Sequence, residues 1–410
     1  MTSNQKHAAE AYVWIWLPDA TEPIVCGKLE KENELYVFSY GKNYRKNPHA
    51  IVLSPLELPL HLGKYTPEGM NIIHSCLRDA APDAWGRMLI DYQYSPFLPN
   101  ELDYLLLSGS NRIGALDFQV SATEYVPRTA KEIYIEDLDR FASQLESGES
   151  FKGSLNPLFL HGTSVGGARP KCLMTINQTD YIAKFSLSTD VYPIVKAEYI
   201  GMKLAKAVGI HVAEVQLDRI TARDVLLVQR FDRVRKENQI LRKLLLSGLS
   251  LLGLNEMEAR YASYQSFATT IREKFLHPKN QLTELFKRLV FNVLIGNTDD
   301  HARNHAAFWD GNALSLTPAY DLCPQQRVGS EATQAMAIGG IEGNFSTIRN
   351  ILSISHCFLL EESQAVQIVE HQYETICSLW KLLCDEVGLS KNSRELLWKR
   401  AILNDFCLAK

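Results

Sequence analysis

The feature that most constrains this chain is an apolar run at residues 289–296 that leads directly into a strongly polar segment at residues 297–304. The apolar run predicts a buried element. The polar segment, Asn-Thr-Asp-Asp-His-Ala-Arg-Asn, combines carboxylates, carboxamides, an imidazole and a guanidinium. A buried element that leads directly into so polar a segment is typical of a functional site. The alternative is a helix that ends in an ordinary turn rich in Asn and Asp.

Two residues of this segment have the spacing that phosphoryl transfer requires. Asp299 and Asn304 are five positions apart, like the carboxylate that meets the substrate hydroxyl and the Asn that binds metal in protein kinases. Asp300 is only four positions from Asn304, so Asp299 is the better candidate for that carboxylate. Mg²⁺ is usually held by one or two carboxylates together with substrate phosphates, and Asp321 is the candidate for a further ligand.

A glycine-rich loop at residues 162–171 is the second site-like segment. Adjacent glycines let the backbone approach a ligand, and successive amide N–H groups can form an anion-binding nest; the alternative is an ordinary hairpin loop. Lys184 lies in an apolar strand soon after, where its charge needs a partner. Glu198 falls at helical spacing with the apolar residues of the next helix. A strand Lys paired with a Glu on the following helix is how kinases hold ATP phosphates.

Composition narrows the class of protein. With 410 residues, 46% of them hydrophobic, the chain can bury a large core in two or three domains. A net charge of -4 gives no reason to expect charge-driven binding to nucleic acid or to an anionic membrane. The eight cysteines include no Cys-x-x-Cys pair. This pattern favours reduced thiols in a cytosolic protein and argues against a zinc site. No apolar run approaches the roughly 18 residues of a spanning helix.

The pattern along the chain predicts an α+β fold with three units. Short β-rich runs between turn residues predict a small sheet near the N-terminus. The run at 225–233 is predicted to be a buried strand that connects two lobes, and from residue 241 onward the pattern is helical. The predicted units are an N-terminal subdomain at residues 1–125, an N-lobe with the glycine-rich loop at residues 126–235, and a helical C-lobe at residues 236–410.

In their order and spacing, these segments resemble the HipA family, serine/threonine kinases that act as the toxins of bacterial toxin–antitoxin pairs. The resemblance implies a bilobal, protein-kinase-like fold with a small β-rich N-terminal subdomain and an all-helical C-terminal lobe. It covers nearly the whole chain. The motifs that carry it lie at residues 77–87, 111–116, 162–171, around Lys184, and at residues 229–233, 297–304 and 318–321.

The resemblance also implies a role for each site residue. Asp299 would be the catalytic base, and Asn304 and Asp321 the Mg²⁺ ligands. In this family a Ser of the glycine-rich loop is autophosphorylated, which ejects the loop and switches the kinase off; Ser164 stands at that place, with Thr163 as a second candidate. The implied ATP-binding residues are Lys184, Gln229, Phe231, Val165, Gly166, Gly167, Lys171, Glu198 and His301.

Further expectations follow from the resemblance. The cofactors would be ATP and Mg²⁺, and the substrate a Ser or Thr of a protein, with an aminoacyl-tRNA synthetase as one candidate because family members modify such enzymes to inhibit translation and growth. A small helix-turn-helix antitoxin, similar to HipB, would bind the kinase and carry it to operator DNA. The expected location is the bacterial cytoplasm, without membrane contact.

Four alternatives remain open. A small-molecule kinase of the aminoglycoside or choline type has a carboxylate and an Asn at the same separation, and an acidic pocket would favour it. A catalytically silent nucleotide-binding protein is disfavoured by the joint presence of Lys184, Asp299, Asn304 and Asp321. His301 is also compatible with a structural role, and His301 with His305, four positions apart, is compatible with a metal site on a helix face.

Overall fold

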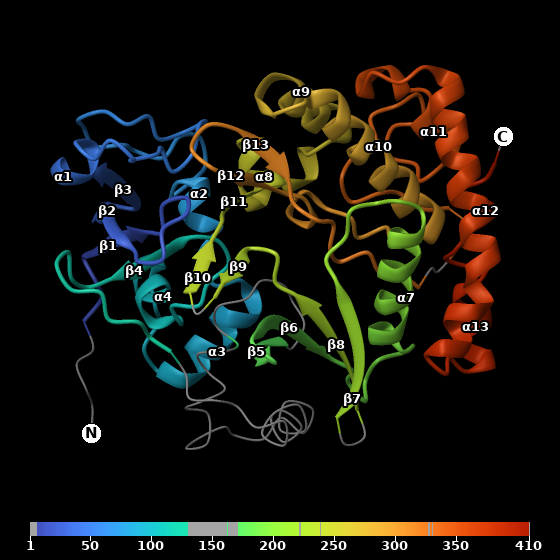
Figure 1. Ribbon diagram of the computed structural model, residues 1–410, viewed down its shortest axis with the longest axis horizontal. Helices are drawn as coiled ribbons and strands as arrows, with labels where there is room; N and C mark the ends of the chain where they lie inside the picture. Colours follow the sequence, from blue (N-terminus) through green and yellow to red (C-terminus); the bar gives the residue numbers. More distant parts are fainter. Residues whose placement is uncertain are drawn as a thin grey trace.

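The computed structural model describes residues 6–129, 162, 171–220, 223–237, 239–326, 329 and 331–409. Its N-terminal subdomain, blue at one end of Figure 1, is built on an antiparallel sheet with strand order β3-β2-β1-β4. β4 is buried along its whole length, and most residues of β1 and β3 are buried as well. The strands are β1 (Glu10–Ile15), β2 (Ile24–Glu32), β3 (Leu35–Tyr40) and β4 (Leu116–Gln119).

Four helices complete the subdomain, and two of them have clear start signals. Asp83 caps the third helix by accepting a hydrogen bond from Gly86 N at 3.0 Å. Asn100 and Asp103 form a reciprocal capping box at the start of the fourth. The four are α1 (Lys42–Arg45), α2 (Ser75–Arg78), α3 (Ala84–Tyr94) and α4 (Glu101–Leu107).

The N-lobe is a second antiparallel sheet, covered on both faces. Its strand order is β5-β6-β8-β7, from β5 (Lys171–Ile176), β6 (Thr179–Phe185), β7 (Val215–Ile220) and β8 (Arg223–Gln229). Leu226 and Val228 of β8 share a core with helix α7 (Ile194–Ala207). Val225 and Leu227, on the opposite face, pack with Trp85 and other residues of α3. The N-terminal subdomain therefore supplies one layer of the N-lobe.

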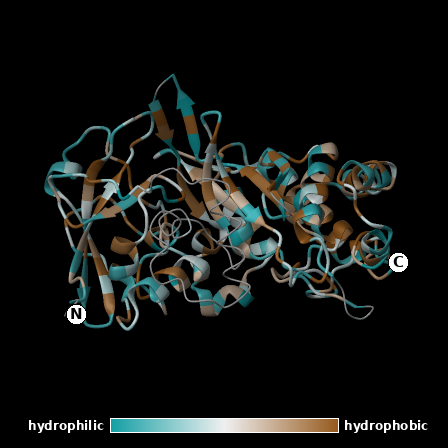
Figure 2. Cartoon of the chain, turned by 90° about the horizontal axis from the view of Figure 1, so that it is seen from below, coloured by the Kyte–Doolittle hydropathy of each residue, from teal (hydrophilic) through white to brown (hydrophobic). Residues whose placement is uncertain are grey.

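The C-lobe follows a hairpin, β9 (Arg233–Lys236) and β10 (Gln239–Arg242), and contains most of the helices. Brown and teal segments alternate along these helices in Figure 2, as amphipathic packing requires. No helix of the described part of the chain has the length and apolar character needed to cross a membrane. The helical elements are α8 (Gly248–Leu251), η1 (Glu256–Tyr261), α9 (Tyr264–Lys274), α10 (Pro278–Ile295), η2 (Ala302–Asn304), α11 (Ile348–Leu352), η3 (Ser355–Phe358), α12 (Glu362–Glu386) and α13 (Lys391–Leu397).

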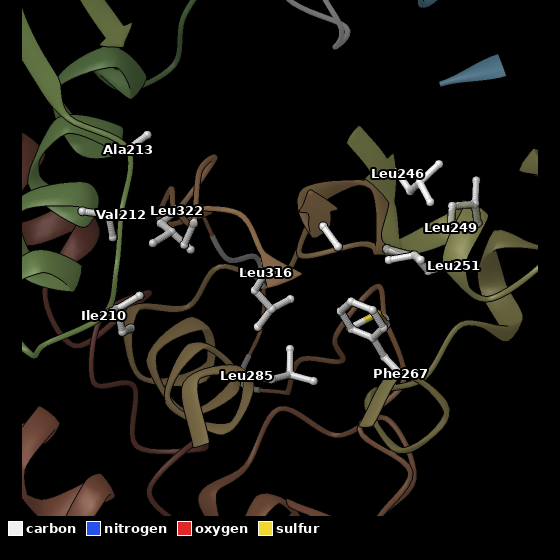
Figure 3. Close-up of a cluster of buried hydrophobic side chains, with 14 of the residues drawn as sticks. Ile210, Val212, Ala213, Leu246, Leu249, Leu251, Phe267, Leu285, Leu316 and Leu322 are labelled. Carbon is white, nitrogen blue, oxygen red and sulfur yellow. The ribbon is translucent and has the colours of Figure 1, made fainter. Parts of the chain in front are cut away.

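The C-lobe is not entirely helical, so that detail of the predicted fold was wrong. Three short strands form an antiparallel sheet with order β11-β12-β13: β11 (Leu244–Ser247), β12 (Ala306–Trp309) and β13 (Leu314–Leu316). The leucines of β11 were assigned to a helix because a short, fully apolar run has no periodicity that separates a strand from a buried helix. Leu246 of β11 and Leu316 of β13 lie in the core shown in Figure 3.

A buried polar network ties the N-terminal subdomain to the segment that follows β8. Nitrogens of Arg230 and Arg233 lie 2.8 and 2.9 Å from Asp232 Oδ2. The same oxygen accepts from Gly114 N at 2.7 Å, and both guanidinium groups donate to the carbonyl of Arg112. Burial favours a neutral Asp232, yet the two guanidinium groups hold its pKa below the ordinary value. The carboxylate therefore stays charged at neutral pH.

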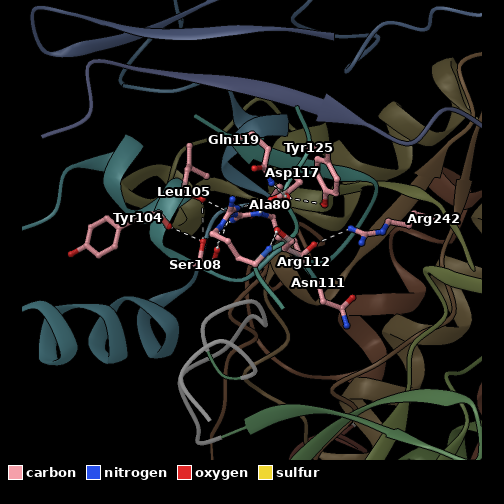
Figure 4. A network of polar contacts seen from close by, with 12 residues as sticks. Ala80, Tyr104, Leu105, Ser108, Asn111, Arg112, Asp117, Gln119, Tyr125 and Arg242 are labelled. Carbon is pink, nitrogen blue, oxygen red and sulfur yellow. Dashed lines mark hydrogen bonds and ion pairs between the residues drawn. The ribbon is translucent and has the colours of Figure 1, made fainter. Parts of the chain in front are cut away.

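Arg112 itself is buried inside the subdomain, at the centre of Figure 4. Its Nε donates to Asp117 Oδ1 at 2.8 Å and its Nη1 to Ser108 Oγ at 2.8 Å. Burial raises the pKa of Asp117, but Arg112 and Arg128 outweigh that effect and lower it to about 2. Removing one member of such a network leaves a buried charge without its partner.

We predict that Asp232→Ala lowers the free energy of unfolding by about 3–5 kcal/mol, because it leaves two buried guanidinium groups without their carboxylate. Urea denaturation of the full chain measures the change. Asp405 is exposed, so the control Asp405→Ala should stay within about 0.5 kcal/mol of the parent protein. Equal stability of the two variants would contradict a structural role for the network.

Candidate active site

Helix α10 is buried at its C-terminal end and leads directly into the polar segment, as the apolar run predicted. The helix ends at Gly296, which has φ +70°, a left-handed conformation that glycine adopts without steric cost. A Cβ at Gly296 would stand 2.4 Å from the carbonyl oxygen of Ala401, so the backbone also needs glycine for space. The amide of Leu403 donates to the Leu294 carbonyl at 2.7 Å. The C-terminal part of the chain therefore holds the end of α10 in place.

The two adjacent aspartates of the segment lie in opposite environments. Asp300 is 1% exposed, accepts a hydrogen bond from the Tyr264 hydroxyl, and lies 3.1 Å from His305 Nε2. Burial and the Asp300 charge raise the pKa of Tyr264, so its hydroxyl keeps the proton that it donates. Asp299 is exposed, and its side chain has no hydrogen-bond partner among the described residues. Asp300 is thus a structural carboxylate, whereas Asp299 is open to a substrate.

The structure does not join His301 and His305 into a metal pair. The residues between them form the short 3-10 turn η2 rather than an α-helix. His301 is exposed, whereas His305 is 2% exposed and packs against the rings of Tyr264 and Phe267 at centroid distances of 5.6 and 5.7 Å. His301 nevertheless acts electrostatically on Asp321, which places it near the site.

Lys184, Glu198 and Asp321 form one charged cluster from three distant parts of the chain. Lys184 Nζ donates to Glu198 Oε1 at 2.6 Å and to Asp321 Oδ1. Burial disfavours the charge on Lys184, but Asp321 and Glu198 outweigh it and raise the Lys184 pKa. Burial raises the pKa of Asp321, but the charges of Lys184 and Lys171 outweigh that effect and lower it to about 2. The cluster carries one cation and two acidic groups.

The backbone of Asp321 has φ +57°, a left-handed conformation that few non-glycine residues adopt. Asn297 supports it, since its Nδ2 donates to the Asp321 carbonyl at 3.3 Å and to Asn292 Oδ1 at 3.0 Å. The side chain of Asp321 remains 41% exposed, compared with 15% for Lys184. Sequence reasoning assigned no role to Asn297. Its position directly after the C-cap glycine was the available signal.

Helix α7 contacts the segment after Asp321 without any side chain between them. A Cβ at Gly201 would stand 2.1 Å from the carbonyl oxygen of Leu322. Gly201 lies three residues after Glu198, on the same face of the helix. The close approach therefore fixes the distance between the two acidic groups of the cluster.

The segment after β8 runs from the N-lobe to the C-lobe, in line with the predicted connection. The Gln229 amide already donates to the Glu214 carbonyl at 2.8 Å. The Phe231 ring lies 5.7 Å from that of Tyr320 and 6.0 Å from that of Phe308. Phe231 therefore packs against residues that flank the polar segment, while the Gln229 N–H is occupied.

Thr163, Ser164, Val165, Gly166 and Gly167 lie outside the described residues. The end of that loop is described: Lys171 is 6% exposed and pairs with Lys184 across β5 and β6. Burial lowers the Lys171 pKa, and the neighbouring charge of Lys184 lowers it further.

The family model named HipA-like C-terminal domain matches residues 163–380, and that of the HipA N-terminal domain matches residues 17–119. The chain belongs to the HipA family. This outcome confirms the resemblance seen in the motifs.

Curated relatives of this HipA-family chain include a serine/threonine-protein kinase toxin HipA of Shewanella oneidensis, 28% identical over 186 residues. A putative kinase of Haemophilus influenzae is 24% identical over 208 residues. The matches cover 39% and 46% of this chain, and 42% and 60% of the relatives' own length.

The solved structure of a Shewanella oneidensis complex of HipA, HipB and operator DNA contains a similar chain, with a TM-score of 0.73 and 18% identity. The similarity covers 96% of this HipA-family chain and 99% of the other. At this identity it supports the fold alone. The predicted bilobal, kinase-like α+β fold is thereby confirmed.

We predict that Gly201→Ala destabilises this HipA-family protein by about 1–3 kcal/mol through overpacking against Leu322. Without that contact, alanine inside a helix would instead stabilise by up to about 1 kcal/mol, so the sign of the change is decisive. Urea denaturation measures it. Gly41→Ala is the control, because Gly41 has φ -63° and its Cβ would meet Cys26 O at an ordinary 3.6 Å.

Proposed function

We propose that this HipA-family chain is an ATP- and Mg²⁺-dependent serine/threonine protein kinase. The observation that carries the proposal is the contact of Lys184 with both Glu198 and Asp321. In protein kinases the strand lysine pairs with a helix glutamate, and a further aspartate binds the metal. Here the three groups meet although Asp321 is 137 positions from Lys184.

The donor set of the site fits Mg²⁺. Asn304 and Asp321 offer a carboxamide and a carboxylate oxygen, which are hard ligands of the kind this ion prefers, and Asp321 keeps 41% of its side chain exposed. When bound, the ion supplies charge stabilisation to the transferring phosphoryl group. Lys184, whose raised pKa keeps it cationic at neutral pH, is placed to bind phosphate oxygens.

Asp299 is the proposed catalytic base. Its exposed carboxylate orients the substrate hydroxyl and accepts its proton as the new O–P bond forms and ADP leaves. Asp300 does not fit this role, because Tyr264 and His305 already hold its carboxylate inside the lobe. For adenine, the N–H of Phe231 is the better donor: the Gln229 amide is bonded to Glu214, whereas none of the described residues accepts from the Phe231 amide.

We further propose that the substrate is a protein Ser or Thr, that modification of the substrate inhibits growth, and that autophosphorylation of Ser164 or Thr163 switches the enzyme off. The named relative that is a serine/threonine-protein kinase toxin supports the first two points. An aminoacyl-tRNA synthetase remains the predicted substrate class. The similar fold in a complex with HipB and operator DNA supports a helix-turn-helix antitoxin as partner and DNA contact through that partner.

Intact-mass analysis with peptide mapping tests the reaction. After incubation of the dephosphorylated protein with ATP and Mg²⁺, we expect one added phosphoryl group at Ser164 or Thr163. Asp299→Asn should lower the rate by about 10²–10⁴-fold, because it removes the base. If ATP binds but neither protein gains mass, a small-molecule kinase or a silent nucleotide-binding protein replaces the proposed function.

Nucleotide binding is tested separately. Lys184→Ala should weaken MgATP binding about 10–100-fold, measured by isothermal titration calorimetry, because hydrogen bonds to charged groups contribute about 1.5–3 kcal/mol. Lys206→Ala is the control: Lys206 lies in the last turn of the helix that carries Glu198, and it pairs with Glu214 in an exposed salt bridge. Equal affinities of the two variants would contradict a phosphate-binding role for Lys184.

A further inference from the structure

Tyr320 connects the two segments that carry the metal-ligand candidates Asn304 and Asp321. It directly precedes Asp321, and its hydroxyl donates a hydrogen bond to the backbone carbonyl of Arg303 at 2.8 Å. Arg303 in turn directly precedes Asn304. One side chain therefore joins the backbone beside one candidate ligand to the backbone beside the other.

The hydrogen bond lies beyond the end of the sheet that pairs these segments. Strands β12 and β13 are antiparallel, with Ala307 opposite Leu316. Arg303 lies four residues before Ala307, and Tyr320 lies four residues after Leu316, so the two residues stand at matching positions. Residues 302–304 leave the extended conformation and form η2. The long tyrosine side chain therefore makes the link that a backbone amide would make inside the sheet.

Each segment is also attached to a different part of the chain. Ala319 exchanges backbone hydrogen bonds of 2.8 and 2.9 Å with residues 211–213, which lie shortly after α7. The other segment is held at α8, since the Gly248 amide donates to the His305 carbonyl at 2.7 Å. The Tyr320 hydroxyl thus ties a segment that contacts the end of the N-lobe helix to a turn that is fixed in the C-lobe.

The turn next to Arg303 also fixes the carboxamide of Asn304. The Asn304 Nδ2 donates to the Asp299 carbonyl at 3.4 Å, and the Asn304 backbone N–H donates to the His301 carbonyl at 2.8 Å. The carboxamide oxygen is the atom that remains for a metal ion, and Mg²⁺ prefers oxygen ligands. A displacement of Arg303 would therefore move a candidate ligand and loosen its contact with the proposed base.

We propose that Tyr320 is a positioning residue of the phosphotransfer site, whose hydroxyl fixes the separation between Asn304 and Asp321. The inference rests on the proposed function. Mg²⁺ demands near-ideal octahedral geometry with ligands at about 2.0–2.1 Å, so a small change in the separation of two protein ligands costs affinity. Groups that hold metal ligands in place typically contribute roughly 10–100-fold to metal affinity or activity.

The test is the affinity of the full chain for a non-hydrolysable ATP analogue, measured by isothermal titration calorimetry with Mg²⁺ and with EDTA. Tyr320→Phe removes the hydroxyl and keeps the ring, which lies 5.7 Å from that of Phe231. We expect this variant to bind the analogue about 10-fold more weakly with Mg²⁺. Its affinity in EDTA should equal that of the parent protein, because only the metal-dependent part of binding needs the two ligands at a fixed separation.

Tyr44→Phe is the matched control. The Tyr44 hydroxyl donates to the Ile51 carbonyl at 2.9 Å within the N-terminal subdomain, so this variant removes the same kind of hydrogen bond away from the site. It should change neither affinity. For Tyr320→Phe, an equal loss with Mg²⁺ and with EDTA would indicate packing alone, and unchanged affinities would indicate no role; either result overturns the inference.

Phosphoryl transfer separates the inference from the proposed function. In an active parent protein, Tyr320→Phe should raise the Mg²⁺ concentration that gives half the maximal rate about 10-fold. A rate that falls equally at every Mg²⁺ concentration would overturn the inference and leave the kinase standing. If the parent transfers no phosphoryl group, the proposed function fails and the calorimetric comparison still decides the role of Tyr320. A parent that binds the analogue equally with Mg²⁺ and with EDTA would overturn the inference as well.

Discussion

The buried charge of Lys184 is the constraint on which the rest of the structure depends. A cation in an apolar strand, with only 15% of its side chain exposed, needs anionic partners, because an unpaired buried charge is strongly destabilising. Those partners come from α7 and from the segment after β13. The N-lobe sheet, its covering helix and the C-lobe must therefore meet at one point. The glycine at position 201 is a consequence, since any side chain there would push α7 away from Leu322.

A second set of buried charges lies directly after the end of β8. Asp232 lies between Arg230 and Arg233, and both guanidinium groups donate to the backbone of Arg112 in the N-terminal subdomain. Buried ion pairs are weak evidence for stability but give strict geometry, because displacing one member exposes the others to a large penalty. Together with the packing of α3 on the N-lobe sheet, this network makes the subdomain a structural part of the kinase-like core.

The sequence allowed the site to be predicted better than the packing around it. The pairing of Lys184 with Glu198 and the course of α10 followed from charge in apolar surroundings and from helical spacing, both local signals. The strand β11 was misassigned because its leucines carry no period. Arg230, Asp232 and Arg233 were considered only as part of a connection between lobes. Their partners in the N-terminal subdomain are 118 or more positions earlier in the chain, and no local pattern encodes such a distance.

The neighbouring residues Asp299 and Asp300 show how the fold assigns different roles to identical side chains. The spacing to Asn304 favoured Asp299 over Asp300 as the carboxylate that meets a substrate hydroxyl. The environments of the two carboxylates differ in the same direction, since Asp299 is exposed and Asp300 is buried. Tyr264 and His305 hold Asp300 inside the lobe, and its carbonyl accepts from the Met336 amide at 3.0 Å. A backbone held this firmly at Asp300 leaves Asp299 little freedom. Phosphoryl transfer depends mainly on the placement of charges and reacting atoms. Under the proposed function, the buried aspartate would therefore contribute by fixing where the exposed one stands.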